Sequence, residues 1–198
     1  MIIFSSKRKR NSKKSYFDTR DAAWQFLIDN NVRSYPLDLQ RVVNQNGWKV
    51  LNKRSYILRH PTLRKYAKRS EGLTIELNGS YIILIDAEGS SVQRNRFTIA
   101  HEIGHIYLQH VGTKNVTIEK EANMFASRIL MPMLLIKELD LKTAEELSKL
   151  CNVSLQAATY RIKRYSQIKD REKFYTSPLE RQVHEQLKQF IEQQKEKK

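Results

Sequence analysis

The chain has 198 residues, a length that fits one domain with at most a small appendage and excludes a multidomain assembly. Its formal net charge of +15 favours an anionic partner such as DNA, RNA or an acidic protein face. No apolar run approaches about 20 residues, and a single cysteine, Cys151, excludes an intramolecular disulfide and a cysteine-rich metal site. The apolar start precedes a basic run, the reverse of a signal peptide, so we expect a soluble cytoplasmic protein with no membrane partner.

The N-terminal quarter is predicted to hold a basic arm and two helices. Residues 1–15 are rich in Lys, Arg, Ser and Asn with little to bury, which predicts a flexible arm. A first amphipathic helix follows the arm. A second helix is expected over 37–46, opened by Pro36 and closed by Gly47.

Three short strands are predicted next. The first covers Trp48–Leu51, and two more, 73–77 and 81–85, flank the hairpin turn Asn78-Gly79. Between the first and second strands lies a basic block, 52–70, whose period is unclear, so that a short helix and a loop both remain open.

The remainder of the chain is predicted to be helical. The last of these helices carries an apolar stripe that is typical of a docking or dimer face. The expected helices cover about 95–110, about 117–130, a segment after Pro132, 143–151, 154–165 and 179–194.

The most informative pattern is the sequence from His101 to His105. Histidines at positions i and i+4 of a helix lie on one face, so both imidazoles can bind one Zn²⁺ at ~2.0–2.1 Å. Glu102 lies beside the first of them, where a carboxylate can take a proton from a zinc-bound water. Gly104 costs the helix about 1 kcal/mol relative to alanine, which is easier to explain if something approaches the backbone there.

A catalytic zinc site needs a third protein ligand. Glu121 falls in one row with Phe125 and Ile129 on the apolar side of the next helix, so we expect Glu121 to be that ligand. Glu119 falls on the opposite side and is expected to be a surface charge. His110 is too near the helix end to swing back, and we do not expect it to coordinate the metal.

Three motifs together resemble one known family. They are Arg94 to His105, then Glu119 to Ala126, then Leu130-Met-Pro132, and their order and spacing are similar to those of the ImmA/IrrE metallopeptidases. The resemblance covers roughly 20–165 and implies an α+β fold, mostly helical, with a small three-stranded sheet packed beside the His-Glu-x-x-His helix.

The resemblance also implies roles for individual residues. His101, His105 and Glu121 would bind one zinc ion, and Glu102 would be the catalytic base. The implied substrate is a helix-turn-helix repressor of a prophage, a mobile element or a stress regulon. The resemblance assigns no role to the basic arm or to the C-terminal extension.

Further side chains are weaker candidates for the site. Arg94 and Arg96 could contact substrate or a developing oxyanion, although a surface pair is the favoured interpretation. Tyr107 and Tyr160 could each donate a hydrogen bond to an oxyanion, and the sequence does not choose between them.

A second motif, 147–162, follows a helix-turn-helix pattern. Asn152 occupies the turn, and the helix after it would present Gln156, Thr159, Tyr160 and Lys163 to DNA. The alternative is a helical hairpin packed on the protease core, in which Cys151 is a small core residue.

The leading hypothesis is therefore a zinc endopeptidase, and the alternative is a DNA-binding regulator with a structural or vestigial zinc site. Glu102 favours the peptidase, because a structural site has no use for a carboxylate beside an open zinc position. The expected parts are a basic arm (1–15), a metallopeptidase core (16–140), a helix-turn-helix-like segment (141–168) and a C-terminal helical extension (169–198).

Overall fold

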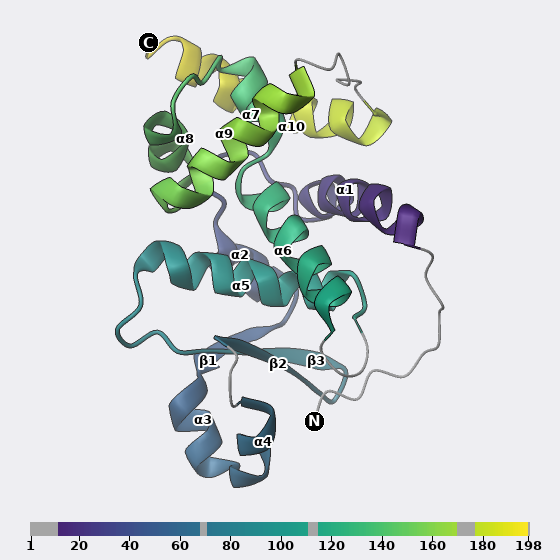
Figure 1. The fold of residues 1–198 in the computed structure, drawn as a ribbon, viewed down its shortest axis with the longest axis vertical. Helices are drawn as coiled ribbons and strands as arrows, with labels where there is room; N and C mark the ends of the chain where they lie inside the picture. The colour runs from purple at the N-terminus through teal and green to yellow at the C-terminus, as the bar shows by residue number, and fades with distance from the viewer. Residues whose placement is uncertain (1–11, 68–70, 111–114, 170–176, 198) are drawn as a thin grey trace. The chain divides into compact units, whose positions relative to one another are not determined.

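The computed structural model describes residues 12–67, 71–110, 115–169 and 177–197, and side chains from Thr19 onward (Figure 1). Most of the predicted basic arm therefore lies outside the described residues, while its last four residues belong to the first helix. In chain order the elements are α1 (Ser12–Asp29), α2 (Leu39–Gln45), β1 (Lys49–Asn52), α3 (Lys53–Arg59), the 3₁₀ turn η1 (Pro61–Leu63), α4 (Arg64–Ala67), β2 (Gly72–Leu77), β3 (Ser80–Ile85), α5 (Val92–Tyr107), α6 (Val116–Leu130), α7 (Met133–Glu138), α8 (Ala144–Cys151), α9 (Leu155–Lys169) and α10 (Pro178–Lys195).

The chain divides into two compact units. The first combines residues 1–19 with 39–126, and the second combines 20–38 with 127–198. None of the helices in the described ranges is long and apolar enough to cross a membrane.

The first unit contains a three-stranded sheet in the order β1-β3-β2. Strand β1 runs parallel to β3, whereas β2 is antiparallel to β3 and lies at an edge. The β2–β3 hairpin turns through Asn78 and Gly79, whose φ angles of 52° and 77° are both positive. These angles confirm the predicted turn. Asparagine and glycine suit it because they tolerate the left-handed conformation at low cost.

Successive side chains of each strand point to opposite faces of the sheet, and the two faces pack against different elements. Leu73, Ile75 and Leu84 form a small core with side chains from α3, η1 and α4. Helix α5 packs against β2 and β3, where the Thr74 side chain contacts Glu102 of α5 and the backbone of Gly72 lies close to the same residue. The predicted fold class, a mostly helical α+β fold with a small sheet beside the His-Glu-x-x-His helix, is confirmed.

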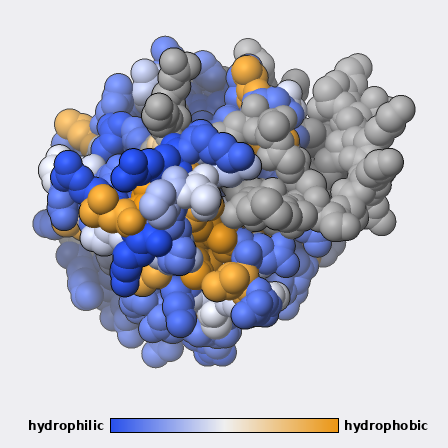
Figure 2. Space-filling model, turned by 90° about the horizontal axis from the view of Figure 1, so that it is seen from below, coloured by the Kyte–Doolittle hydropathy of each residue, from blue (hydrophilic) through white to orange (hydrophobic). Residues whose placement is uncertain are grey.

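The basic block that the sequence left open forms α3, η1 and α4. Lys53 at its start is buried, and its Nζ lies 2.7 Å from a carboxylate oxygen of Asp86. The other basic side chains between Lys53 and Ala67 are exposed, and they include Arg59 and Arg64. Figure 2 views the molecule from the side where α3 and α4 lie in Figure 1 and shows apolar surface among strongly hydrophilic surface.

In the second unit, the apolar stripe of α10 is buried within the chain. Leu187 is fully buried, and the rings of Phe190 and Tyr35 lie 6.4 Å apart. Gln186 Nε2 donates hydrogen bonds of 3.3 and 3.5 Å to the carbonyls of Leu27 and Val32. Of the two predicted uses of this stripe, docking is the one that the structure supports, and the face is filled by the chain itself.

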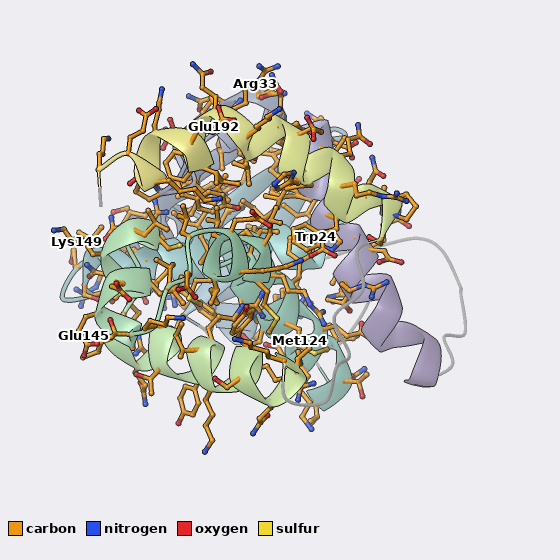
Figure 3. All side chains as sticks on the ribbon, turned by 90° about the horizontal axis from the view of Figure 1, so that it is seen from above. Trp24, Arg33, Met124, Glu145, Lys149 and Glu192 are labelled. Carbon is orange, nitrogen blue, oxygen red and sulfur yellow. The ribbon has the colours of Figure 1, made fainter. Side chains whose placement is uncertain are left out.

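Helices α8 and α9 are joined by a short turn, Asn152 to Ser154. Thr143 and Glu146 form a capping box at the start of α8, and Asn152 ends α8 in the left-handed conformation (φ 49°, ψ 58°). Glu145 and Lys149 point outward from α8 (Figure 3). Cys151 is fully buried, which confirms that it is a small core residue.

Burial of Glu180 leads to a prediction about pH. Desolvation raises the pKa of this carboxyl above its ordinary value, although a hydrogen bond from Ser177 opposes the shift. A raised folded-state pKa means that the ionised form costs stability at neutral pH, and that this cost disappears as the pH falls. We expect Glu180→Gln to raise the melting temperature at pH 7.5 and to lose this advantage toward pH 4.

The matched control is Glu192→Gln, since Glu192 points outward from the same helix (Figure 3). Its melting temperature should follow the wild type at every pH. A gain in melting temperature for Glu180→Gln that is the same at every pH would contradict the raised pKa of Glu180.

Candidate metal centre

Three side chains from α5 and α6 converge in the first unit. His101 Nε2 and His105 Nε2 lie 2.9 Å apart, and the two oxygens of Glu119 lie 3.3 and 3.5 Å from them. All three ligand atoms are within 4.8 Å of one another. Two imidazole nitrogens and one carboxylate oxygen are the donors that a catalytic zinc site uses.

The two helices hold these donors in place through local rules. Ser91 caps α5 by accepting from the Arg94 backbone N–H, and the i, i+4 spacing then stacks the histidines on one face. Glu119 and Asn123 have the same spacing on α6. They occupy the face of α6 that reaches the histidines.

Gly104 allows α6 to come close to α5. A Cβ atom at this position would lie 3.2 Å from the Ala122 carbonyl oxygen and 3.2 Å from Phe125 Cδ1. The backbone approach expected from this glycine is therefore present, and the approaching group is α6.

The hydrogen bond of His101 fits metal binding. His101 Nδ1 lies 2.9 Å from Asn123 Oδ1, and an amide oxygen can only accept, so Nδ1 carries the proton. The lone pair of Nε2 then faces His105 and Glu119, as a metal ligand requires. The donor set and this tautomer are both suited to Zn²⁺.

Glu121, the expected third ligand, is not part of this group. Its Oε2 lies 2.9 Å from His110 Nε2, and both side chains are buried. The apolar row with Phe125 correctly predicted that Glu121 is buried, but its carboxylate contacts His110 and not the histidine pair. The structure brings Glu119 to the histidine pair instead, and its i, i+4 relation to Asn123 is the pattern that could have identified it.

Glu102 is buried against β2, and a side chain of that strand holds it. Thr74 Oγ1 donates a 2.7 Å hydrogen bond to Glu102 Oε2, and the residue is 3% exposed. Gly72 makes room for the carboxylate, because a Cβ there would lie 2.5 Å from Glu102 Oε1. Neither Thr74 nor Gly72 was singled out from the sequence, since the contact depends on the register between helix and strand.

The close contact at Gly72 predicts a loss of stability in Gly72→Ala. The added methyl would also lie 2.8 Å from Thr98 Cγ2, so the neighbours must shift. Overpacking of this kind costs about 1–3 kcal/mol of unfolding free energy, which urea denaturation measures. In a Gly72→Ala/Glu102→Ala double variant part of the loss should disappear, and strictly additive losses would contradict the contact.

A pocket of about 360 Å³ adjoins the Glu102 contact. Thr98 belongs both to its wall and to the group of atoms around Gly72, which places the pocket beside the buried carboxylate. The complete lining is Lys53, Ala67, Glu71, Ile85, Asp86, Ser90, Asn95 and Thr98.

The weaker candidates lie as follows. The Arg94 guanidinium pairs with Glu71 at the surface. Arg96 is half-buried on α5. The Tyr107 ring packs against Phe125, with centroids 5.6 Å apart.

The four side chains proposed to contact DNA lie in the second unit. All of them are exposed, and Tyr160 is 67% exposed. They are Gln156, Thr159, Tyr160 and Lys163 of α9.

A search of the curated proteins finds no match to this chain. The family model described as the IrrE N-terminal-like domain, Peptidase_M78, matches residues 56–163. This span is more than half of the chain, and it contains α5, α6, α8 and the first nine residues of α9. The sequence resemblance is thereby confirmed, and the chain belongs to the ImmA/IrrE family of metallopeptidase-type proteins.

Proposed function

We propose that the protein is a zinc-dependent endopeptidase whose metal ligands are His101, His105 and Glu119. The observation that carries the proposal is the convergence of these three donors, together with the buried carboxylate of Glu102, the residue after His101 in the same helix. Three protein ligands leave a position open for water or substrate, which distinguishes a catalytic zinc site from a structural one. Zinc bound there would lower the pKa of a coordinated water to near 7 and polarise the substrate carbonyl.

Glu102 acts as the general base in this proposal. It accepts a proton from the attacking water and delivers a proton to the leaving amine nitrogen as the peptide bond breaks. The hydrogen bond from Thr74 fixes one carboxylate oxygen, and Gly72 leaves space around the other. The side chain is thus positioned before substrate arrives.

The substrate is proposed to be an extended segment of a protein. Strand β2 carries both Glu102 contacts and lies at an edge of the sheet, where an extended peptide can add backbone hydrogen bonds. By the resemblance given above, the protein that supplies this segment would be a helix-turn-helix repressor.

Metal analysis and a cleavage assay test the proposal. The purified protein should contain one zinc per chain, and a His101→Ala/His105→Ala double variant should contain none. Incubation of the zinc-loaded protein with a repressor encoded beside it should produce defined fragments that a chelator abolishes. Unchanged zinc content in the double variant would refute the site.

DNA binding by α9 is a second proposed function. The turn at Asn152 has the left-handed geometry of a helix–turn–helix, and the exposed side chains of α9 include Lys163. Phosphate contacts by such side chains make affinity fall with salt.

Fluorescence anisotropy with a labelled duplex tests this second function. Lys163→Ala should weaken binding and reduce the salt slope by about one. Lys188→Ala on the exposed face of α10 is the matched control and should leave both unchanged. Equal effects of the two variants, or no binding at low salt, would exclude α9 as the DNA-reading helix.

A further inference from the structure

Behind His105, on the side away from the other two donors, lies a chain of buried polar groups. His105 Nδ1 lies 3.0 Å from His110 Nδ1, and His110 Nε2 lies 2.9 Å from Glu121 Oε2. The side chains of His110 and Glu121 are only 5% and 7% exposed. Polar groups at this depth need a defined partner, because leaving one unsatisfied costs about 1–3 kcal/mol.

The backbone after α5 turns sharply enough to return His110 toward the helix. Gln109 adopts a positive φ of 52°, and the His110 N–H donates a 3.0 Å hydrogen bond to the His105 carbonyl. This left-handed ending lets His110 reach back toward α5, although its position so near the helix end predicts that it cannot.

The carboxylate of Glu121, the last of these buried polar groups, determines where each proton lies. An ionised Glu121 can only accept, so His110 Nε2 carries a proton and His110 Nδ1, in a neutral ring, has a lone pair. That lone pair accepts from His105 Nδ1–H, and the proton at Nδ1 leaves His105 Nε2 with a lone pair. Nε2 is the atom that faces His101 and Glu119.

We propose that His110 and Glu121 are positioning residues that hold His105 in the Nδ1–H tautomer and in the ring orientation that a metal ligand needs. His105 would be held by this pair as His101 is held by Asn123. The inference rests on the proposed metal site and adds two residues that do not coordinate the ion themselves. Partners of this kind are typically worth about 10–100-fold in metal affinity.

The tautomer of His105 can be measured in the metal-free protein. Long-range ¹H–¹⁵N correlation spectra of the imidazole rings should show His105 protonated at Nδ1 in the wild type. In His110→Phe, which keeps a ring but no nitrogen, the Nε2–H tautomer of His105 should appear. A wild type with His105 protonated at Nε2 overturns the proposal, whether or not any variant folds.

Zinc affinity, from competition with a chelator, gives the second readout. His110→Phe should bind zinc about 10–100-fold more weakly than the wild type. His110→Asn should recover most of the loss, because its amide oxygen can take the place of Nδ1 as acceptor. Equal affinity in wild type and His110→Phe refutes the positioning role, whereas a wild type that binds no zinc refutes the metal site itself.

Discussion

Replacement of Glu102 by glutamine is expected to abolish most peptide hydrolysis and to leave zinc binding and folding unchanged. Glutamine keeps the volume of the side chain and can still accept the Thr74 hydrogen bond, but it cannot accept the proton of the attacking water. General-base catalysis is commonly worth ~10²–10⁴-fold in rate, and the loss should be at the upper end of this range. The rate is measured with zinc-loaded protein and a purified repressor substrate.

Glu192→Gln is the matched control for this experiment. Glu192 is exposed on α10, which supplies no residue to the proposed site, so the same chemical exchange should leave the cleavage rate unaltered. Cleavage at the wild-type rate by zinc-loaded Glu102→Gln would rule out Glu102 as the base.

Glu119→Ala is expected to lose zinc to a greater extent than any substitution behind the histidines. Both oxygens of Glu119 lie within 3.5 Å of the histidine Nε2 atoms, so its removal takes away one of the three donors. The affinity should fall by more than the ~100-fold upper limit for outer partners. Competition with a chelator and the absorption spectrum of the Co²⁺-substituted protein both measure this change.

Glu121→Gln provides the comparison, since glutamine still offers an oxygen to His110 and changes only the charge. We expect its zinc affinity to lie much closer to the wild type. If Glu121→Gln lost zinc while Glu119→Ala retained it, the third ligand would be Glu121, as first expected from the sequence, and not Glu119.

Local rules predicted most elements of the fold. The Asn78-Gly79 turn and the Gly47 helix end require positive φ angles, and all three residues have one. Pro36 was less informative, because α2 begins only at Leu39. The 52–70 block stayed open because its helices are only seven and four residues long, too short to establish a period.

The candidate site was predictable where it depends on one helix and unpredictable where it depends on two. His101, Glu102 and His105 follow from spacing within α5 alone. The choice between Glu119 and Glu121 depends on how α6 is rotated against α5 and on the turn that brings back His110. No periodicity in α6 contains that information, because both residues are at least partly covered.

The missing side chain at Gly104 also makes metal binding and folding interdependent. Since α6 reaches the histidines only by packing directly on this glycine, an ion shared by α5 and α6 would act as a crosslink between two helices. Ligands that bind only the native state add their binding free energy to its stability. The amide hydrogens of α5 and α6 should therefore exchange with solvent more slowly when zinc is present, so that metal supply to the protein would also govern its resistance to degradation.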